Sequence, residues 1–217
     1  MRGQAKLPIG VLASGHGTNL GVILDSCARG SLDAEVRVVI SNRPTAAALE
    51  LSRRVGVATC AFAREDYPDR AAQQHDMKEA LIRHGVELVV LAGFDQILSD
   101  EFVDEFSFRI VNLHPSLLPA FGGGMHAVRD ALQHGAKVTG CTVHFVATEY
   151  PETDTGPILL QEAVPVREDD DEQTLLERIH EVEHRLLPAA IQLIAEGRVQ
   201  IEGRRVRILS PSAVQRN

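Results

Sequence analysis

The apolar residues of the chain fall into short runs that are separated by amphipathic stretches. Five runs are short and almost continuously apolar, which predicts buried strands; they cover residues 7–13, 36–41, 58–62, 87–92 and 109–113. Between them, apolar residues recur at helical spacing, as in Leu20, Ile23, Leu24 and Cys27. Strands that alternate with helices indicate a parallel sheet with right-handed crossovers. We therefore expect an α/β fold, a Rossmann-like three-layer sandwich.

The second half of the chain shows a different pattern. Residues 139–146 alternate as a strand does, and residues 158–166 supply its expected antiparallel partner. An acidic start predicts a helix from about residue 169 to Leu187, broken at Pro188 and followed by a short helix. The expected sheet is thus mostly parallel with antiparallel C-terminal strands. No linker divides the chain, so we expect one domain over 1–217, with segments at about 7–108, 109–195 and a hairpin at 198–209.

Composition narrows the class of partner. Apolar residues make up 44% of the 217 residues, enough for a full core, and the formal net charge is -8. An acidic chain is a poor general surface for nucleic acid or anionic membranes. The three cysteines are widely spaced, and neither a signal peptide nor a membrane span is evident. We expect a cytoplasmic monomer or homodimer that acts on small molecules.

A glycine-rich loop follows the first predicted strand and precedes a helix. Its sequence, Ser14-Gly-His-Gly-Thr-Asn19, gathers backbone N–H groups where an anion can bind. Leu20 stands where a dinucleotide fingerprint has its third glycine, and no Lys-Ser/Thr pair suggests a nucleoside triphosphate. Gly17, Thr18 and Asn19 therefore predict a site for one phosphate monoester; the alternative is a glycine turn without a ligand.

The fifth predicted strand ends on an amide and an imidazole. Asn112 and His114 are two residues apart, so an extended backbone directs both to the same side, and Pro115 ends the strand. Ligands of such sheets bind beyond the carboxyl ends of the strands. The loops after strands one, four and five are therefore candidates for a site, although His114 could also be a buried, hydrogen-bonded residue at a strand end.

A zinc site is the competing interpretation. His180-Glu181-Val182-Glu183-His184 matches H-E-x-x-H, and its two histidines would share one helix face. A third ligand is missing downstream except for Glu196, and an apolar stripe explains the helix as a core element. Residues His114, His126, His144 and Cys141 lack a diagnostic spacing. We predict no metal.

Several motifs occur in one order along residues 7–195: LASGHGTNL, LAGFDQIL, IVNLHPSLLP, GCTVHFV, DTGPILLQ and EHRLLP. Together they resemble the phosphoribosylglycinamide formyltransferases, a branch of the folate formyltransferase and hydrolase superfamily. The resemblance implies transfer of a formyl group from 10-formyltetrahydrofolate to the glycine amine of the ribonucleotide in de novo purine biosynthesis.

The resemblance also implies roles for individual residues. Asn112 would donate a hydrogen bond to the oxyanion, protonated His114 would stabilise it and supply a proton, and Asp154 would keep His114 cationic. Gly17, Thr18 and Asn19 would hold the phosphate, and Glu183 the ribonucleotide. The folate would meet Arg64, the backbone of Asp95, Gln96, Ile97 and Leu98, and Asn112. His126 and His144 are expected to line the site.

Three departures from the family pattern bear on these roles. Asp95-Gln96 replaces a common Met-Arg pair, residues 121–126 replace a Pro-Gly turn, and loop 147–153 is longer. The placement of Asp154 depends on the Gly156-Pro157 anchor, and a turn-capping role is its alternative. The nearest rival function is hydrolysis of formyltetrahydrofolate, whose enzymes carry an extra N-terminal domain. A tRNA formyltransferase would need a basic RNA-binding domain, and a non-catalytic nucleotide-binding protein is the remote alternative.

Overall fold

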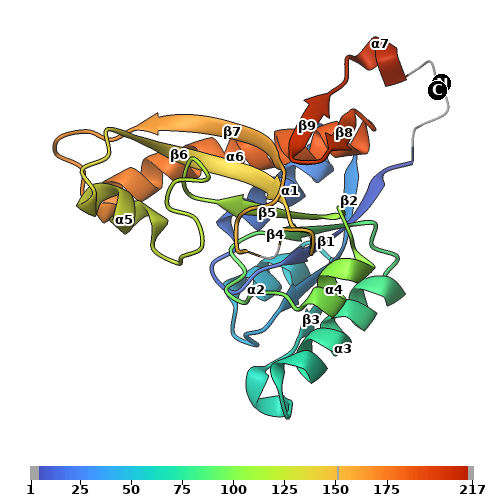
Figure 1. The fold of residues 1–217 in the computed structure, drawn as a ribbon. Helices are drawn as coiled ribbons and strands as arrows, with labels where there is room; N and C mark the ends of the chain where they lie inside the picture. Colours follow the sequence, from blue (N-terminus) through green and yellow to red (C-terminus); the bar gives the residue numbers. More distant parts are fainter. Residues whose placement is uncertain (1–4, 151, 215–217) are drawn as a thin grey trace. The chain divides into compact units, whose positions relative to one another are not determined.

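The computed structural model describes residues 5–150 and 152–214 in two compact units that meet at the Val111–Asn112 bond. Figure 1 labels the elements of both units. Among the described helices, none combines the length and the apolar character that crossing a membrane requires.

The first unit contains a parallel sheet. Its strands are β1 (Leu7–Leu12), β2 (Ala34–Ser41), β3 (Ala58–Ala61) and β4 (Leu88–Leu91), in the spatial order β3-β2-β1-β4. Every described pair is parallel; Val38, for example, stands opposite Ala58, and Ile9 opposite Leu88. The chain therefore builds outward from β1 to β3 and then crosses back to β4 on the other side of β1. This reversal leaves a topological switch point at the carboxyl ends of β1 and β4.

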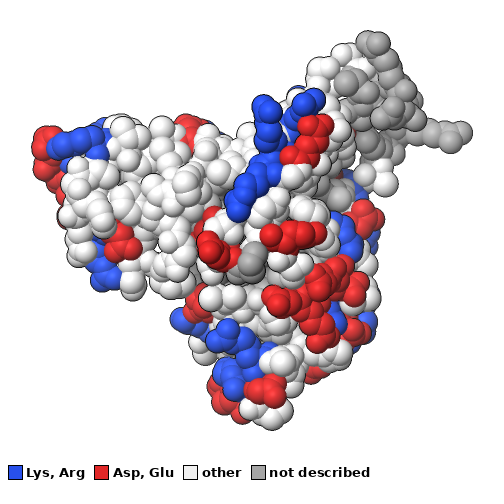
Figure 2. Space-filling view, in the orientation of Figure 1, with Lys and Arg blue, Asp and Glu red and all other residues white. Residues whose placement is uncertain are grey.

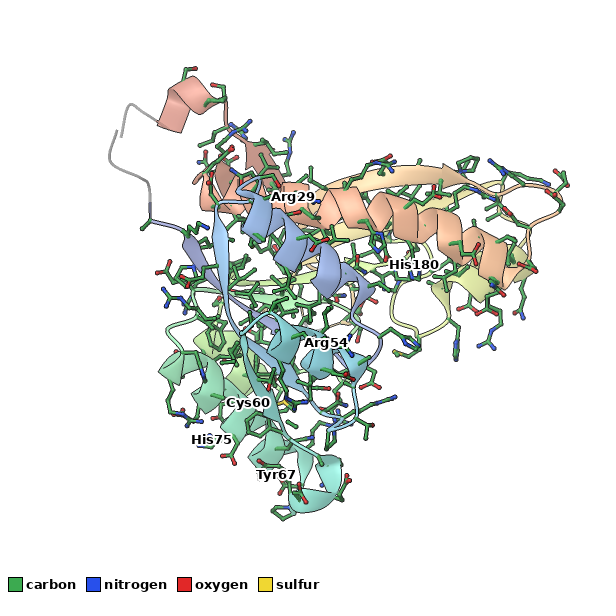
Figure 3. All side chains as sticks on the ribbon, turned by 180° about the vertical axis from the view of Figure 1, so that it is seen from behind. Arg29, Arg54, Cys60, Tyr67, His75 and His180 are labelled. Atoms are coloured by element: carbon green, nitrogen blue, oxygen red, sulfur yellow. The ribbon has the colours of Figure 1, made fainter. Side chains whose placement is uncertain are left out.

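Helices connect these strands: α1 (Thr18–Arg29), α2 (Ala47–Arg54), the 3₁₀ turn η1 (Arg64–Asp66), α3 (Arg70–Arg83) and α4 (Asp100–Glu105). Right-handed crossovers place α1 and α2 on one face of the sheet and α3 on the other. Figure 3 shows Arg29 and Arg54 at the ends of α1 and α2. The packing of α3 is close, because a Cβ on Gly10 of β1 would lie 2.4 Å from Leu81 Cδ2. Ser99 caps α4, since its Oγ accepts from Phe102 N at 3.3 Å.

The second unit is built on antiparallel pairing. Strand β5 (Ile110–His114) brings the chain into it, and the further elements are α5 (Ala127–Gln133), β6 (Val138–Phe145), β7 (Ile158–Pro165), α6 (Glu172–Ala195), β8 (Val199–Glu202), β9 (Arg205–Ile208) and α7 (Pro211–Val214). β6 and β7 pair antiparallel, and β8 and β9 form the expected hairpin with Gly203 at positive φ in its turn. The predicted α/β class, with parallel strands first and antiparallel strands later, is confirmed.

The predicted break at Pro188 is wrong. Helix α6 runs without interruption from Glu172 to Ala195 with Pro188 inside it. An Asp171 capping box starts the helix, and buried residues recur along one face on both sides of the proline: Leu175, Ile179, Val182, Leu186, Leu187, Ala190 and Ile191. The proline removes one backbone hydrogen bond. Burial of this continuous stripe outweighs that cost.

Candidate active site

The end of β5 places two polar side chains in an otherwise apolar strand. Asn112 is half-buried and His114 is buried, 5% exposed. The chain then turns, with Ser116 N donating to His114 O at 2.9 Å. Thr142 of β6 fixes the segment that follows, because its Oγ donates to Ser116 O at 2.7 Å and accepts from Leu118 N at 3.1 Å. The strand end is therefore held on a rigid frame.

Asp154 lies against both residues. Its Oδ2 is 3.2 Å from His114 Nδ1, and its Oδ1 accepts from Asn112 Nδ2 at 3.2 Å. Gly123 N also donates to Oδ2 at 2.9 Å. The side chains of His114 and Asp154 are only 7% and 6% exposed. The structure thus brings together the three residues that the sequence singled out for catalysis, all within the second unit.

His144 is more central than the sequence suggested. Its Nε2 lies 3.1 Å from Asn112 Nδ2 and 3.4 Å from Asp154 Oδ1, and its Nδ1 lies 3.1 Å from Phe145 O. The Asn112 amide is consequently held between a carboxylate and an imidazole. The four side chains of Asn112, His114, His144 and Asp154 form one buried polar group, which we call the catalytic cluster.

The contacts of the catalytic cluster define its charge. Both ring nitrogens of His114 face oxygen acceptors, Asp154 Oδ2 and, at 2.9 Å from Nε2, Phe121 O. Only the doubly protonated imidazolium donates to both. Burial raises the pKa of the Asp154 carboxyl, but the contact with His144, the charge of His114 and the Gly123 N–H lower it more, so its pKa lies below the usual value. The arrangement is a buried histidine–carboxylate pair.

The glycine segment after β5 closes over this pair. It supplies the Phe121 carbonyl and the Gly123 N–H, both from residues with positive φ, at 56° and 78°. His126 is exposed at the N-terminal end of α5 and makes none of the hydrogen bonds that join the catalytic cluster. Of the two histidines expected to line the site, the structure therefore places His144 in the cluster and His126 outside its contacts.

The predicted phosphate loop lies in the first unit, at the start of α1. Gly17 has a φ of 76°, and a Cβ there would lie 3.0 Å from both Cα and Cβ of Ala48, so the position requires glycine. Thr18 is exposed and Asn19 is half-buried on the first turn of the 12-residue helix. This geometry leaves backbone N–H groups and the Thr18 hydroxyl at a helix N-terminus, as an anion site needs.

The loop after β4 is organised by two buried glutamines of α3. Gln74 donates to Ile97 O at 2.9 Å and accepts from Ser99 N at 2.7 Å, while Gln96 Nε2 donates to Gln73 Oε1 at 3.3 Å. Asp95 is tied to the ends of the neighbouring strands by Ser14, Asn42 and Arg43. Leu98 completes the loop. Arg64, in η1, is exposed and donates to Tyr67 O at 2.7 Å.

The H-E-x-x-H segment lies on α6. His180 and His184 stack with ring centroids 6.2 Å apart, whereas Glu181 is exposed. Glu183 is buried, 4% exposed, and its Oε2 lies 3.9 Å from His180 Nε2. Figure 3 labels His180 on this helix. Across residues 5–150 and 152–214, no three His, Cys, Asp or Glu side chains are grouped so that they could hold a metal ion.

Comparison with known proteins identifies the family. The formyl transferase family model matches residues 7–191. The chain is 45% identical over 194 residues to a phosphoribosylglycinamide formyltransferase of Mycobacterium tuberculosis, covering 89% of this chain and 87% of that protein. It is 43% identical to the trifunctional purine biosynthetic protein adenosine-3 of Gallus gallus over 90% of its own length, but spans only 19% of that longer protein.

A solved structure agrees with the sequence comparisons. The crystal structure of glycinamide ribonucleotide transformylase 1 from Symbiobacterium toebii is 50% identical, covers 95% of both chains and superposes with a TM-score of 0.91. The sequence and fold comparisons agree over nearly the whole chain, so they assign it to one family. The chain belongs to the formyl transferase family, among the phosphoribosylglycinamide formyltransferases.

Proposed function

We propose that the protein transfers the formyl group of 10-formyltetrahydrofolate to the amine of 5'-phosphoribosylglycinamide, as a cytoplasmic monomer or homodimer in de novo purine biosynthesis. The observation that carries the proposal is the buried catalytic cluster, in which Asn112, the His114 imidazolium and the Asp154 carboxylate are in contact. Family membership supports the same reaction. No metal takes part in the proposed reaction.

The catalytic cluster suits each step of acyl transfer. The substrate amine attacks the formyl carbon, a C–N bond forms, and the formyl oxygen becomes negatively charged. Asn112 and cationic His114 donate hydrogen bonds to that oxygen. The bond from the formyl carbon to the folate nitrogen then breaks; His114 delivers a proton to that nitrogen and regains one from the attacking amine, so it ends the cycle as it began. Asp154 keeps His114 oriented and favours its cationic form.

Substrate has to displace contacts of both donors, because Asn112 Nδ2 is held by Asp154 and His144 and His114 Nε2 by Phe121. In the structure, His114 Nε2 donates to Phe121 O at 2.9 Å. Because Nδ1 faces Asp154, the Nε2–H is the ring donor that His114 can offer to substrate. We infer that the formyl oxygen replaces the Phe121 carbonyl as the acceptor, which requires the glycine segment to shift. One such donor to an oxyanion is worth about 10²–10³ in turnover.

Other residues are assigned to substrate binding. Gly17, Thr18 and Asn19 would hold the phosphate at the start of α1, where the helix dipole favours an anion. Glu183 would accept hydrogen bonds from the ribonucleotide. The folate would contact Arg64, the main chain of residues 95–98 and Asn112, with His126 and His144 lining the site. The exposed Arg64 supplies a positive charge for an anionic folate tail.

A single assay separates this function from its rivals. Purified protein should consume 10-formyltetrahydrofolate only when 5'-phosphoribosylglycinamide is added, with the same rate in a chelator. Consumption without the ribonucleotide would establish the hydrolase instead. The fold likeness to a formyltetrahydrofolate deformylase from Pseudomonas syringae, at 24% identity, is a likeness of fold alone. Binding of the ribonucleotide with no consumption under any condition would indicate a non-catalytic nucleotide-binding protein.

A further inference from the structure

The C-terminal hairpin β8–β9 touches the loop that carries Asp154. From the turn between β8 and β9, Arg204 Nη1 donates to Thr155 O at 2.7 Å, and the guanidinium carbon lies 4.7 Å from the ring centroid of Tyr150. One side chain therefore contacts the loop on both sides of Asp154. Figure 2 shows Lys and Arg side chains gathered over this hairpin. All these residues belong to the second unit.

The hairpin arginines differ in what they contact. Arg207 pairs with Glu202 at 3.0 Å and Arg198 with Glu196 at 2.8 Å, each an ion pair local to the hairpin region. Arg204 instead reaches 49 residues back along the chain, to a main-chain oxygen and a tyrosine ring. Arginine suits both partners, because its planar group donates hydrogen bonds and stacks on an aromatic face.

The loop needs external support to hold Asp154 in place. Asp154 has a φ of 61°, in the left-handed region that few residues other than glycine adopt, although aspartate is among those that adopt it more often. Gly156 fixes one end, since a Cβ there would lie 1.9 Å from Phe145 O. Within the loop, Thr155 Oγ1 donates to Glu152 O at 2.7 Å. Arg204 adds a contact from the C-terminal hairpin to those that Asp154 itself makes with β5, β6 and Gly123.

We propose that Arg204 is a positioning residue, which acts through Thr155 and Tyr150 to keep the Asp154 carboxylate against His114. The inference rests on the proposed function, because it gives the hairpin a part in formyl transfer. It implies that loss of the Arg204 contacts loosens loop 147–156 and lowers the fraction of molecules with an assembled catalytic cluster. Turnover should then fall, while binding of the ribonucleotide phosphate, assigned to Gly17–Asn19, should not change.

The test compares Arg204→Ala with Arg205→Ala on the full chain. Arg205 is the next residue, is also exposed and has the same charge, but it begins β9 opposite Glu202 instead of lying in the turn. For Arg204→Ala we expect kcat to fall roughly tenfold, with the KM for 5'-phosphoribosylglycinamide within about twofold of wild type. Amide hydrogen exchange of residues 147–156 should become faster. Arg205→Ala should match wild type in all three measurements.

Two further variants keep the inference falsifiable. Arg204→Lys retains a cation and a hydrogen-bond donor but not the planar group that stacks on Tyr150, and we expect it to recover only part of the lost kcat. Tyr150→Leu removes the ring alone, and combining it with Arg204→Ala should cost less than the product of the two single effects. Equal kcat and equal exchange in the Arg204→Ala and Arg205→Ala proteins would overturn the inference. Wild-type protein that needs no ribonucleotide would instead disprove the proposed function, and the exchange comparison would still test the contact.

Discussion

Replacing Asp154 with asparagine tests the central pair of the site with almost no change of shape. The carboxylate is 6% exposed and accepts from Gly123 N and Asn112 Nδ2 while it contacts His114 Nδ1. An amide supplies only one oxygen acceptor for the two sides that Oδ1 and Oδ2 now serve. If its oxygen faces His114 and Gly123, its NH₂ group faces the Asn112 NH₂. The substitution therefore removes the negative charge and also misaligns one donor.

The expected loss follows from the burial of the pair. Removing one partner of a buried ion pair costs about 3–5 kcal/mol. At about 1.4 kcal/mol for each factor of ten, an energy of this size corresponds to a factor of about 10²–10⁴. Since His114 acts as a cation in the proposed reaction, kcat should fall by about the same factor. The KM for 5'-phosphoribosylglycinamide should change little, because none of the phosphate-loop residues is altered.

The measurement is formyl transfer under saturating substrates, together with NMR detection of the His114 ring N–H protons at pH 7. Wild type should show both ring protons and Asp154→Asn only one. The matched control is Asp170→Asn. Asp170 is another carboxylate with a 3% exposed side chain; it pairs with Arg178 at 2.6 Å near the start of α6 and has no part in the proposed reaction. It should lower stability and leave kcat within about twofold. An Asp154→Asn protein that is folded and retains a fifth of the wild-type kcat would refute the reasoning.

The remaining short predictions address pH, the phosphate loop and a thiol. The pKa of the Asp154 carboxyl is lower in the folded than in the unfolded protein, so the carboxylate stabilises the fold above about pH 4, and this is lost as the pH falls through the folded pKa. In urea titrations at pH 3–5, the free energy of unfolding should therefore depend less steeply on pH in Asp154→Asn than in wild type. Identical slopes would contradict this. Gly17→Ala places a Cβ 3.0 Å from Ala48 on a residue with positive φ, so it should destabilise the fold by about 1–3 kcal/mol. It should also raise the KM for the ribonucleotide and leave the KM for the folate unchanged. Thermal melts and steady-state kinetics measure the two effects, and an unchanged Tm would count against the reasoning. Burial raises the pKa of the Cys141 thiol to about 12, so iodoacetamide at pH 8 should label the half-buried Cys60 before Cys141. Peptide mass mapping over time gives the order of labelling. Faster labelling of Cys141 than of Cys60 would contradict the burial of Cys141.

Much of the catalytic cluster could be predicted because it depends on local pattern. An apolar strand that ends in Asn112-Leu-His114 places both polar side chains on one side, whatever surrounds it. Asp154 was predicted from the family resemblance, with its position set by the Gly156-Pro157 anchor, and the close approach of Gly156 to the Phe145 carbonyl explains why that anchor holds glycine. The Asn112 and His114 inference uses backbone geometry within a few residues, which the sequence determines directly, whereas the Asp154 inference depended on a known family motif.

The contacts that sequence could not supply join segments distant along the chain. His144 was expected to line the site, but the pattern did not reveal that it meets Asn112 directly. The Gly123 N–H and the Arg204 side chain are further examples, since neither residue type carries a signal for its partner. Pro188 shows the opposite error: a strong local rule for breaking helices was overridden by burial along the whole of α6.

Asp95 and Gln96 stand where the family commonly has a Met-Arg pair, and the structure shows what Asp95 does instead. Asp95 joins three strand ends, because its carboxylate accepts from Asn42 Nδ2 at 2.8 Å and pairs with Arg43, and its N–H donates to Ser14 Oγ at 3.0 Å. Burial raises the pKa of the Asp95 carboxyl, but these hydrogen bonds and the charge of Arg43 lower it below its usual value, so the anion is the bonded form.

Asp95 and its partners therefore position a loop whose main chain is assigned to the folate. The loss of about 1–2 kcal/mol of hydrogen bonding in Asp95→Ala should raise the KM for 10-formyltetrahydrofolate roughly fivefold to thirtyfold. The KM for the ribonucleotide should stay within twofold, and Glu65→Ala, an exposed acidic residue of η1, is the control for loss of one negative charge. Equal rises in both KM values would mean that Asp95 supports the fold of the unit in general. A rise in the KM for 10-formyltetrahydrofolate alone would mean that Asp95 positions the loop whose main chain binds the folate. It would explain how Asp95 can stand where the family commonly has another side chain: its neighbours hold the loop in place, and the backbone makes the contacts with the folate.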